Sequence, residues 1–373
     1  MKAGKTLIAG AAVAAAAAGL GVAGPAQAQV QHGRTAGGAV FVQTDNPDGN
    51  SVVAFDRSAD GTLRQARTYP TGGRGGVLAG SQVDHLASQG ALARSGNTLF
   101  AVNAGSDTIS VFGVRGDRLH RTQVVGSGGA FPVSVAVHGS MVYVLNARNG
   151  GSIQGFLRLG DRLVRVPGWH RGLGLDADQT PEFTSTPGQV AFTPDGTKLV
   201  VTTKANGNAI MVFPVSPLGP GRAVTTPDAG NVPFAVTFDP AGRMQVAEAG
   251  PNAVAIFTVG RDGSLQLRSR TATGQRGTCW IVRSGHSVYV SNAGSATVSQ
   301  YRSERGELTS AGTVPTDPGT VDASASSDGR FLYVQTGQTG TVDEFRIGPA
   351  GSLTAIGSVT VPGSVGGEGI VAS

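Results

Sequence analysis

The sequence contains very little cysteine, few aromatic residues and little charge. Cys279 is the one cysteine among 373 residues, so neither an intramolecular disulfide nor a zinc site built from several cysteines can form. Charged residues make up 14% of the chain, and the formal net charge is +5. Its arginines stand singly among acidic residues, without a basic stripe interleaved with aromatics, so we expect no nucleic-acid partner. The six histidines show no metal-ligand spacing, and we expect neither a metal nor a cofactor.

Glycine is the residue present in excess. The chain holds 58 Gly and 19 Pro, without the three-residue period of collagen. Its hydrophobic content of 39% is too high for a disordered chain. The length allows two or three ordinary domains or one large β architecture.

The first 28 residues have the pattern of a secretory signal peptide. Lys2 and Lys5 precede an apolar, alanine-rich run, and Ala26-Gln27-Ala28 supplies the small residues that signal peptidase requires. A transmembrane anchor is the alternative, although a run of about 17 residues dominated by Ala and Gly is short for a span. We therefore predict a signal peptide over 1–28 and a flexible segment over 29–37. After cleavage of the signal peptide, we expect a secreted or periplasmic monomer that is not bound to a membrane.

The rest of the chain is an internal repeat. Seven segments each contain a β-rich run, a small or polar turn, and a second β run that ends in an aromatic residue. These aromatic residues are Phe55, Phe112, Phe156, Phe213, Phe257, Tyr301 and Phe345. Their positions differ by 57, 44, 57, 44, 44 and 44 residues, so the period is 44 with two insertions of 13. A period of this length is typical of propeller blades.

Each unit has room for four short antiparallel strands, because its apolar runs are brief, β-branched and separated by turn residues. Candidate innermost strands are residues 88–93, 132–137, 187–192, 233–238, 277–282 and 320–324. The first unit lacks such a strand, whereas residues 367–372 form an additional one at the end. We predict an all-β, seven-bladed β-propeller over 38–373, closed by pairing of the C-terminal strand within blade 1. A β-helix or a β-sandwich is the alternative.

Three segments carry a resemblance to a known family: LFAVNAG at 99–105, FPVSVA at 131–136 and DGRFLYV at 328–334. They resemble the seven-bladed lactonase family, the β-propeller group of 6-phosphogluconolactonases and carboxymuconate cyclases. The resemblance extends over residues 38–373. It implies a small-molecule lactone or organic acid as ligand, and hydrolysis or formation of a lactone without a metal. A non-catalytic propeller that binds a protein or glycan is the alternative, because export removes the chain from phosphorylated cytosolic sugars.

Strand topology predicts which face carries the site. In an antiparallel blade, the outermost-to-innermost connection and the turn between the second and third strands open at the same face. Both insertions, around 77–88 and 169–186, fall in such connections. Long loops gathered at one mouth of a rigid ring are a common place for binding.

Ionisable residues at this face match the needs of lactone hydrolysis, which are a base to activate water and a cation or amide to stabilise the oxyanion. Glu248 and Asp322 break the neutral pattern of their neighbours, and His85 and His170 fall in the insertions. These four are the candidate catalytic residues. Each has a simpler alternative as a solvated charge or turn residue.

Further polar residues at the strand ends are candidates for substrate binding: Lys204, Arg74, Gln89, Gln189, Asn103, Asn146, Asn292, Trp280 and Glu368. For the asparagines the alternative is that they satisfy backbone groups of turns. Cys279, beside Trp280, is either a nucleophile or a small buried thiol.

Overall fold

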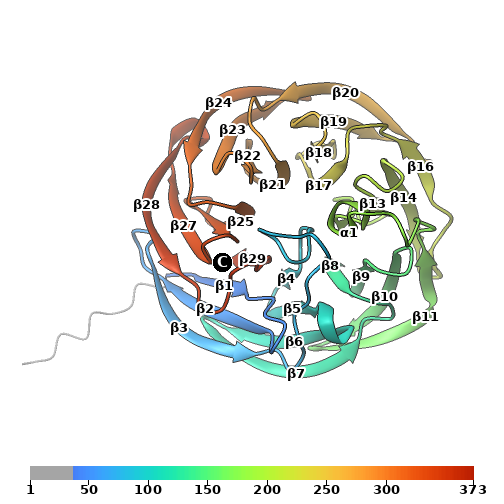
Figure 1. The fold of residues 1–373 in the computed structure, drawn as a ribbon, viewed down its shortest axis with the longest axis horizontal. Helices are drawn as coiled ribbons and strands as arrows, with labels where there is room; N and C mark the ends of the chain where they lie inside the picture. Colours follow the sequence, from blue (N-terminus) through green and yellow to red (C-terminus); the bar gives the residue numbers. More distant parts are fainter. Residues whose placement is uncertain (1–36) are drawn as a thin grey trace, which may run out of the picture. The chain divides into compact units, whose positions relative to one another are not determined.

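Short runs of β-branched and aromatic residues alternate with glycine-rich turns, and each run forms a strand. The computed structural model describes residues 37–373. Figure 1 shows the strands grouped into sheets around a common axis, with the innermost strand of each sheet facing that axis. Seven antiparallel sheets confirm the predicted seven-bladed propeller. The predicted signal peptide lies outside the described residues.

The first three blades contain four strands each. Blade one contains β29 (Ile370–Ala372), β1 (Ala39–Gln43), β2 (Ser51–Arg57) and β3 (Leu63–Pro70). Blade two contains β4 (Leu92–Ser95), β5 (Thr98–Asn103), β6 (Thr108–Arg115) and β7 (Arg118–Gly126). Blade three contains β8 (Pro132–His138), β9 (Met141–Asn146), β10 (Ser152–Leu159) and β11 (Arg162–Gly172).

Blade four departs from this pattern because two short strands share its outer position. It contains β12 (Val190–Phe192), β13 (Lys198–Thr202), β14 (Ala209–Ser216), β15 (Gly219–Pro220) and β16 (Val224–Pro227). Both β15 and β16 pair with β14. The interruption falls at Gly219-Pro220-Gly221, where the sequence lacks the usual turn.

The last three blades return to four strands. Blade five contains β17 (Pro233–Phe238), β18 (Met244–Glu248), β19 (Ala253–Val259) and β20 (Leu265–Ala272). Blade six contains β21 (Thr278–Ser284), β22 (Ser287–Asn292), β23 (Thr297–Glu304) and β24 (Glu307–Pro315). Blade seven contains β25 (Thr320–Ala325), β26 (Phe331–Thr336), β27 (Thr341–Ile347) and β28 (Leu353–Thr360).

The helices of the described chain are a single turn each: α1 (Glu182–Ser185), η1 (Ala104–Ser106) and η2 (Pro349–Gly351). Over the described residues, none of these helices has the length and apolar character needed to cross a bilayer.

The repeated aromatic residues form a layer of the core. All seven lie on the third strand of their blade and are less than 5% exposed. In every blade except the fourth, the pairing of the third and outer strands shifts register beside this residue. Such a bulge increases the local twist of a sheet. The 44-residue period therefore marks a buried aromatic ring in every blade, which lies beside a bulge in all blades but the fourth.

The ring is closed by the two ends of the described chain. In blade one, β1 pairs antiparallel with β29 through Val40–Ala372, Phe41–Val371 and Val42–Ile370. The closure predicted from the unpaired C-terminal strand is confirmed. β29 therefore covers the edge of β1 that would otherwise be unpaired.

The connection from β3 to β4 enters the ring and crosses its channel (Figure 1). The Gln89 side chain exchanges two hydrogen bonds of 2.9 Å with the backbone of Ile281 in blade six. Ser134 of blade three donates to the Gln89 carbonyl at 2.7 Å. We call residues 84–91 the plug. The plug corrects the predicted inner strand 88–93, because β4 begins only at Leu92.

Candidate functional site

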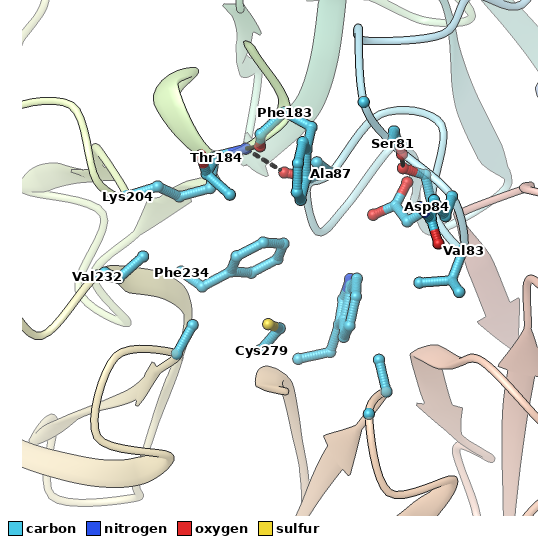
Figure 2. A pocket seen from close by; sticks show the side chains of 16 residues that line it. Ser81, Val83, Asp84, Ala87, Phe183, Thr184, Lys204, Val232, Phe234 and Cys279 are labelled. Atoms are coloured by element: carbon cyan, nitrogen blue, oxygen red, sulfur yellow. Dashed lines mark hydrogen bonds between the residues drawn. The ribbon is translucent and has the colours of Figure 1, made fainter. Parts of the chain in front are cut away.

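A cavity of about 490 Å³ lies at the face that carries both insertions. Its walls come from the loop that precedes the plug, from α1, from strand-joining turns and from the start of β21 (Figure 2). The larger apolar lining residues are Val83, Phe183, Val232, Phe234 and Trp280. The polar lining residues are Ser81, Gln82, Asp84, Thr184, Lys204 and Cys279. Asp84 and Lys204 are therefore the charged residues of the cavity.

Lys204 is a buried cation that joins the two insertions. It follows β13 and has a left-handed backbone, with φ of 53°. Its Nζ donates to the carbonyl oxygens of Ala87 and Phe183, both at 2.6 Å, and to Thr186 Oγ1 at 3.1 Å. Burial lowers the pKa of Lys204 to about 7, although the charge of Asp84 acts in the opposite direction. Lys204 thus lies in the cavity with its three protons donated to the protein.

Asp84 begins the plug and organises its backbone. One carboxyl oxygen accepts the Leu86 amide at 2.8 Å, and the other accepts the Ser88 amide at 2.9 Å. Burial raises the pKa of Asp84 to about 6, whereas these amides and the charge of Lys204 lower it. Each oxygen keeps a second lone pair, so the carboxylate can still accept a proton from a bound water.

Two aromatic rings form one wall of the cavity. Phe234 and Trp280 pack edge to face, with centroids 5.0 Å apart, and the Lys204 ammonium lies 5.4 Å from the Phe234 ring centre. Trp280 donates its indole N–H to the Ser88 carbonyl at 2.6 Å, which fixes it against the plug. Cys279 lines the same wall, and burial raises the pKa of its thiol to about 12. At neutral pH the thiol is protonated, which is unfavourable for a nucleophile.

Three further buried carboxyl groups lie around the plug: Asp45, Asp322 and Glu368. Glu368 accepts the Gly90 amide at 2.9 Å and Ser88 Oγ at 3.2 Å, and its own amide donates to Asp45 at 2.7 Å. Burial raises the pKa of Asp45 to about 8, that of Asp322 to about 7, and that of Glu368 well above its ordinary value. These groups join the plug to the segment leading into β29.

These carboxyl groups do not converge on a metal position. Within residues 37–373, no set of three or more His, Cys, Asp or Glu side chains is arranged to hold a metal ion. Asp322 and Glu368 were candidate site residues, and neither lines the cavity.

Glu248 ends β18 as expected, but its carboxylate is paired with an arginine of its own blade. Arg270 donates to its two oxygens at 2.5 and 2.9 Å, and also to Asp228 at 3.2 Å. Burial raises the pKa of Glu248 to about 7. Glu248 does not line the cavity, although its neighbour Ala249 does.

The two candidate histidines lie apart. His85 follows Asp84 in the first insertion; it is half-buried, burial lowers its pKa, and its buried Nδ1 has no hydrogen-bond partner. His170 does not lie in the second insertion, which corrects its predicted position. It is an exposed residue of the outer strand β11, paired with Gln154, because β11 continues to Gly172.

Most other binding candidates serve the scaffold. Gln89 bonds to Ile281 as described, and Gln189 accepts the Val236 amide at 2.6 Å. The three asparagines donate to hydroxyl groups of the following turn or strand: Asn103 to Ser110, Asn146 to Ser152 and Asn292 to Ser299. Arg74 donates to the Gly105 carbonyl at 3.3 Å and does not line the cavity. Of the predicted residues, Lys204 and Trp280 reach the cavity.

Asp84, Phe183 and Val232 are lining residues that the sequence interpretation did not select. Asp84 is of a residue type that often bonds to the backbone two residues later in a turn, as it does here with the Leu86 amide. Its place in a loop is the sequence feature that could have selected it. Phe183 and Val232 stand in connections whose paths depend on packing between blades. Nothing in their local sequence separates them from other loop residues.

The comparisons with known proteins concern the fold. Neither a protein-family model nor a curated protein matches this sequence. A Bacteroides fragilis structure named "putative 6-phosphogluconolactonase" is similar, with 20% identity and a TM-score of 0.69 over 89% of this chain and 98% of that chain. A Lactobacillus plantarum protein has 20% identity and a TM-score of 0.72 with the same coverage.

A Pseudomonas aeruginosa periplasmic gluconolactonase is also similar, with 19% identity and a TM-score of 0.70 over 89% of this chain and 98% of that chain. Identities in this range establish the fold and leave the activity open. The expected likeness to seven-bladed lactonases is confirmed at the level of the fold.

Proposed function

We propose that the cavity binds a small lactone and opens it by hydrolysis. One observation supports this most directly: a buried carboxyl group and a buried ammonium group, Asp84 and Lys204, line one largely apolar cavity. A carboxylate can activate water, and a nearby cation can stabilise the oxyanion. The fold shared with proteins named as lactonases is a secondary support.

In the proposed reaction, ionised Asp84 accepts a proton from a water molecule as that water adds to the lactone carbonyl carbon. The carbonyl oxygen gains negative charge, which the nearby Lys204 ammonium stabilises through space, since its protons are already donated. The tetrahedral intermediate then breaks its ring C–O bond. The leaving alkoxide takes the proton from Asp84, and the product is a hydroxy acid.

The proposal includes export. The residue pattern of the first 28 residues supports it, as does the similarity in fold to a periplasmic protein. Expression in a bacterial host should yield mature protein that begins at Gln29, measured by intact mass. Full-length protein retained at the membrane would support the anchor instead.

The test is hydrolysis of a panel of lactones by the purified mature protein, with the rate measured as the release of protons from the acid formed. Asp84→Asn should lower kcat by about 10²-fold or more with little change in KM, the range expected for loss of a general base. The proposal would be overturned if the protein hydrolysed no lactone of the panel faster than the uncatalysed reaction. Full activity in a folded Asp84→Asn variant would also overturn it.

Asp239→Asn is a matched control. Asp239 is buried and accepts the Ala241 and Arg243 amides on one oxygen, as Asp84 accepts two amides, and its other oxygen pairs with the Arg243 side chain at 2.6 Å. It lies in the β17–β18 turn, which opens at the opposite face from the cavity. The control should retain activity, and thermal unfolding of both variants separates a loss of fold from a loss of chemistry.

A further inference from the structure

The lining of the cavity limits which lactones it can take. Most of its bulky lining residues are apolar or aromatic, and no arginine is among the described residues that line it. Lys204 donates all three protons to protein oxygens. A phosphate group, which is bound through several charge-assisted hydrogen bonds, would find no cation with a free donor.

Most of the other polar lining side chains are also bonded to the protein, whereas the exposed Gln82 amide and the second lone pairs of Asp84 are available to a ligand. The indole N–H of Trp280 bonds to Ser88, Ser81 Oγ to the Asp84 carbonyl, and Thr184 Oγ1 to the Pro181 carbonyl. A polyhydroxylated sugar buries several hydroxyl groups, and each needs a partner to offset its lost hydration. Among the side chains that line the cavity, Gln82 and Asp84 remain as partners, which is fewer than the several hydroxyl groups of a sugar ring need.

Val232 provides an independent observation. This β-branched residue adopts a left-handed backbone, with φ of 51°, where Asn or Gly is the usual residue. Its amide donates to Asn208 Oδ1 and its carbonyl accepts the Ala249 amide, so the turn holds it in that conformation. The side chain lines the cavity beside Phe234 (Figure 2). The turn requires the left-handed backbone, which Gly277 adopts at the corresponding position of blade six, and the choice of valine at 232 adds an apolar side chain to the cavity wall.

From the lining, the occupied polar groups and the strained valine, we propose that the cavity accepts an uncharged lactone with a flat, apolar body. An aryl-fused or alkyl-substituted lactone fits this description, whereas a phosphorylated or polyhydroxylated sugar lactone does not. This inference rests on the proposed function, whose substrate class it names. The apolar body packs against Phe234, Trp280 and Val232, and the ester group faces Asp84 and Lys204.

The test measures binding separately from turnover by using lactams, which replace the ring oxygen with N–H and resist hydrolysis. The probes are 3,4-dihydro-2-quinolinone, an aryl-fused lactam, and gluconolactam, titrated by calorimetry. We expect the aryl-fused lactam to bind at least 10-fold more tightly. Equal or tighter binding of gluconolactam, or no binding of the aryl-fused lactam, overturns the inference.

Val232→Asn tests the wall without endangering the fold, because asparagine tolerates the left-handed conformation better than valine. It should weaken aryl-lactam binding about 5-fold to 10-fold. Ala296→Asn is the matched control, since Ala296 also has a positive φ, of 51°, and does not line the cavity. Unchanged affinity in Val232→Asn contradicts the placement of the apolar body.

The two proposals can fail separately. If the aryl-fused lactam binds but dihydrocoumarin, the matching lactone, is not hydrolysed, the inference on ligand class stands and the proposed hydrolysis fails. If glucono-δ-lactone is hydrolysed while dihydrocoumarin is not, hydrolysis stands and the ligand class is wrong.

Discussion

Two ionisable side chains of opposite charge face the same cavity, and burial moves their pKa values toward each other. The pKa of Asp84 is raised to about 6 and that of Lys204 is lowered to about 7. The proposed reaction needs Asp84 ionised and Lys204 protonated. We therefore expect kcat/KM for lactone opening to rise with pH through about 6 and to fall through about 7. Initial rates between pH 4.5 and 9, corrected for spontaneous hydrolysis, test this narrow bell, and a plateau extending beyond pH 8 contradicts it.

The buried carboxyl groups beside the plug make a different prediction, on stability. Burial raises the pKa of Asp45 to about 8, so the folded state binds its proton more tightly than the unfolded state does. Stability from this group is present at low pH and is lost as pH rises from about 4 through 8. Asp322 and Glu368 act in the same direction, because burial raises their pKa values too.

Asp45→Asn should therefore flatten this dependence. Asparagine is neutral at every pH and suits the left-handed backbone of Asp45, whose φ is 52°. Between pH 5 and 8 the parent should lose on the order of 4 kcal/mol more unfolding free energy than the variant. Urea unfolding at both pH values measures the difference. The exposed Asp48→Asn in the same turn is the control, and equal slopes in parent and Asp45→Asn would refute the assignment.

At the level of elements, strands could be predicted from sequence and the plug could not. Each strand is determined by residues a few positions apart, and the aromatic period marks a buried position that recurs in every blade. The plug depends on Gln89 meeting Ile281 across 192 positions of chain. Likewise, Glu248 looked available because Arg270 lies on another strand, 22 residues away. Partners of this kind leave no local pattern.

The loop that forms the cavity wall is positioned by a glycine from another blade. Gly337, in the β26–β27 turn, lies so close to Val83 that an added Cβ would be 1.6 Å from the Val83 carbonyl oxygen. Gly337→Ala should displace the loop backbone, lower ligand affinity or kcat/KM at least 10-fold, and cost about 1–3 kcal/mol of stability.

The control for this variant is Gly126→Ala, at the end of outer strand β7. An added Cβ there has no atom within 4 Å, and its backbone is not left-handed. Activity assays and thermal unfolding should show Gly126→Ala close to the parent. Parental activity in Gly337→Ala would mean that the Val83 loop does not determine the cavity.

At the scale of the whole molecule, ring closure and the site are physically connected. The segment leading into β29 contains Glu368, whose carboxyl group accepts amides of the plug at Gly90 and Ala91. Two residues later, at Ile370, the chain begins to pair with β1. The segment that leads into the closing strand therefore also holds the plug, which contributes Asp84 and Ala87 to the lining of the cavity.

Weakening the closing strand should consequently affect stability and binding together. Ile370 is 4% exposed and packs in one core cluster with Val40 and Val42 of β1. Ile370→Ala should cost about 2–5 kcal/mol, and because the plug is bonded to the same segment, ligand affinity should fall as well. Val365→Ala, at a position that is 60% exposed, should stay within about 0.5 kcal/mol of the parent.

Deletion of residues 368–373 should expose the edge of β1 and produce aggregates in size-exclusion chromatography. A monomeric deletion variant with parental melting temperature would show that the ring does not depend on this strand.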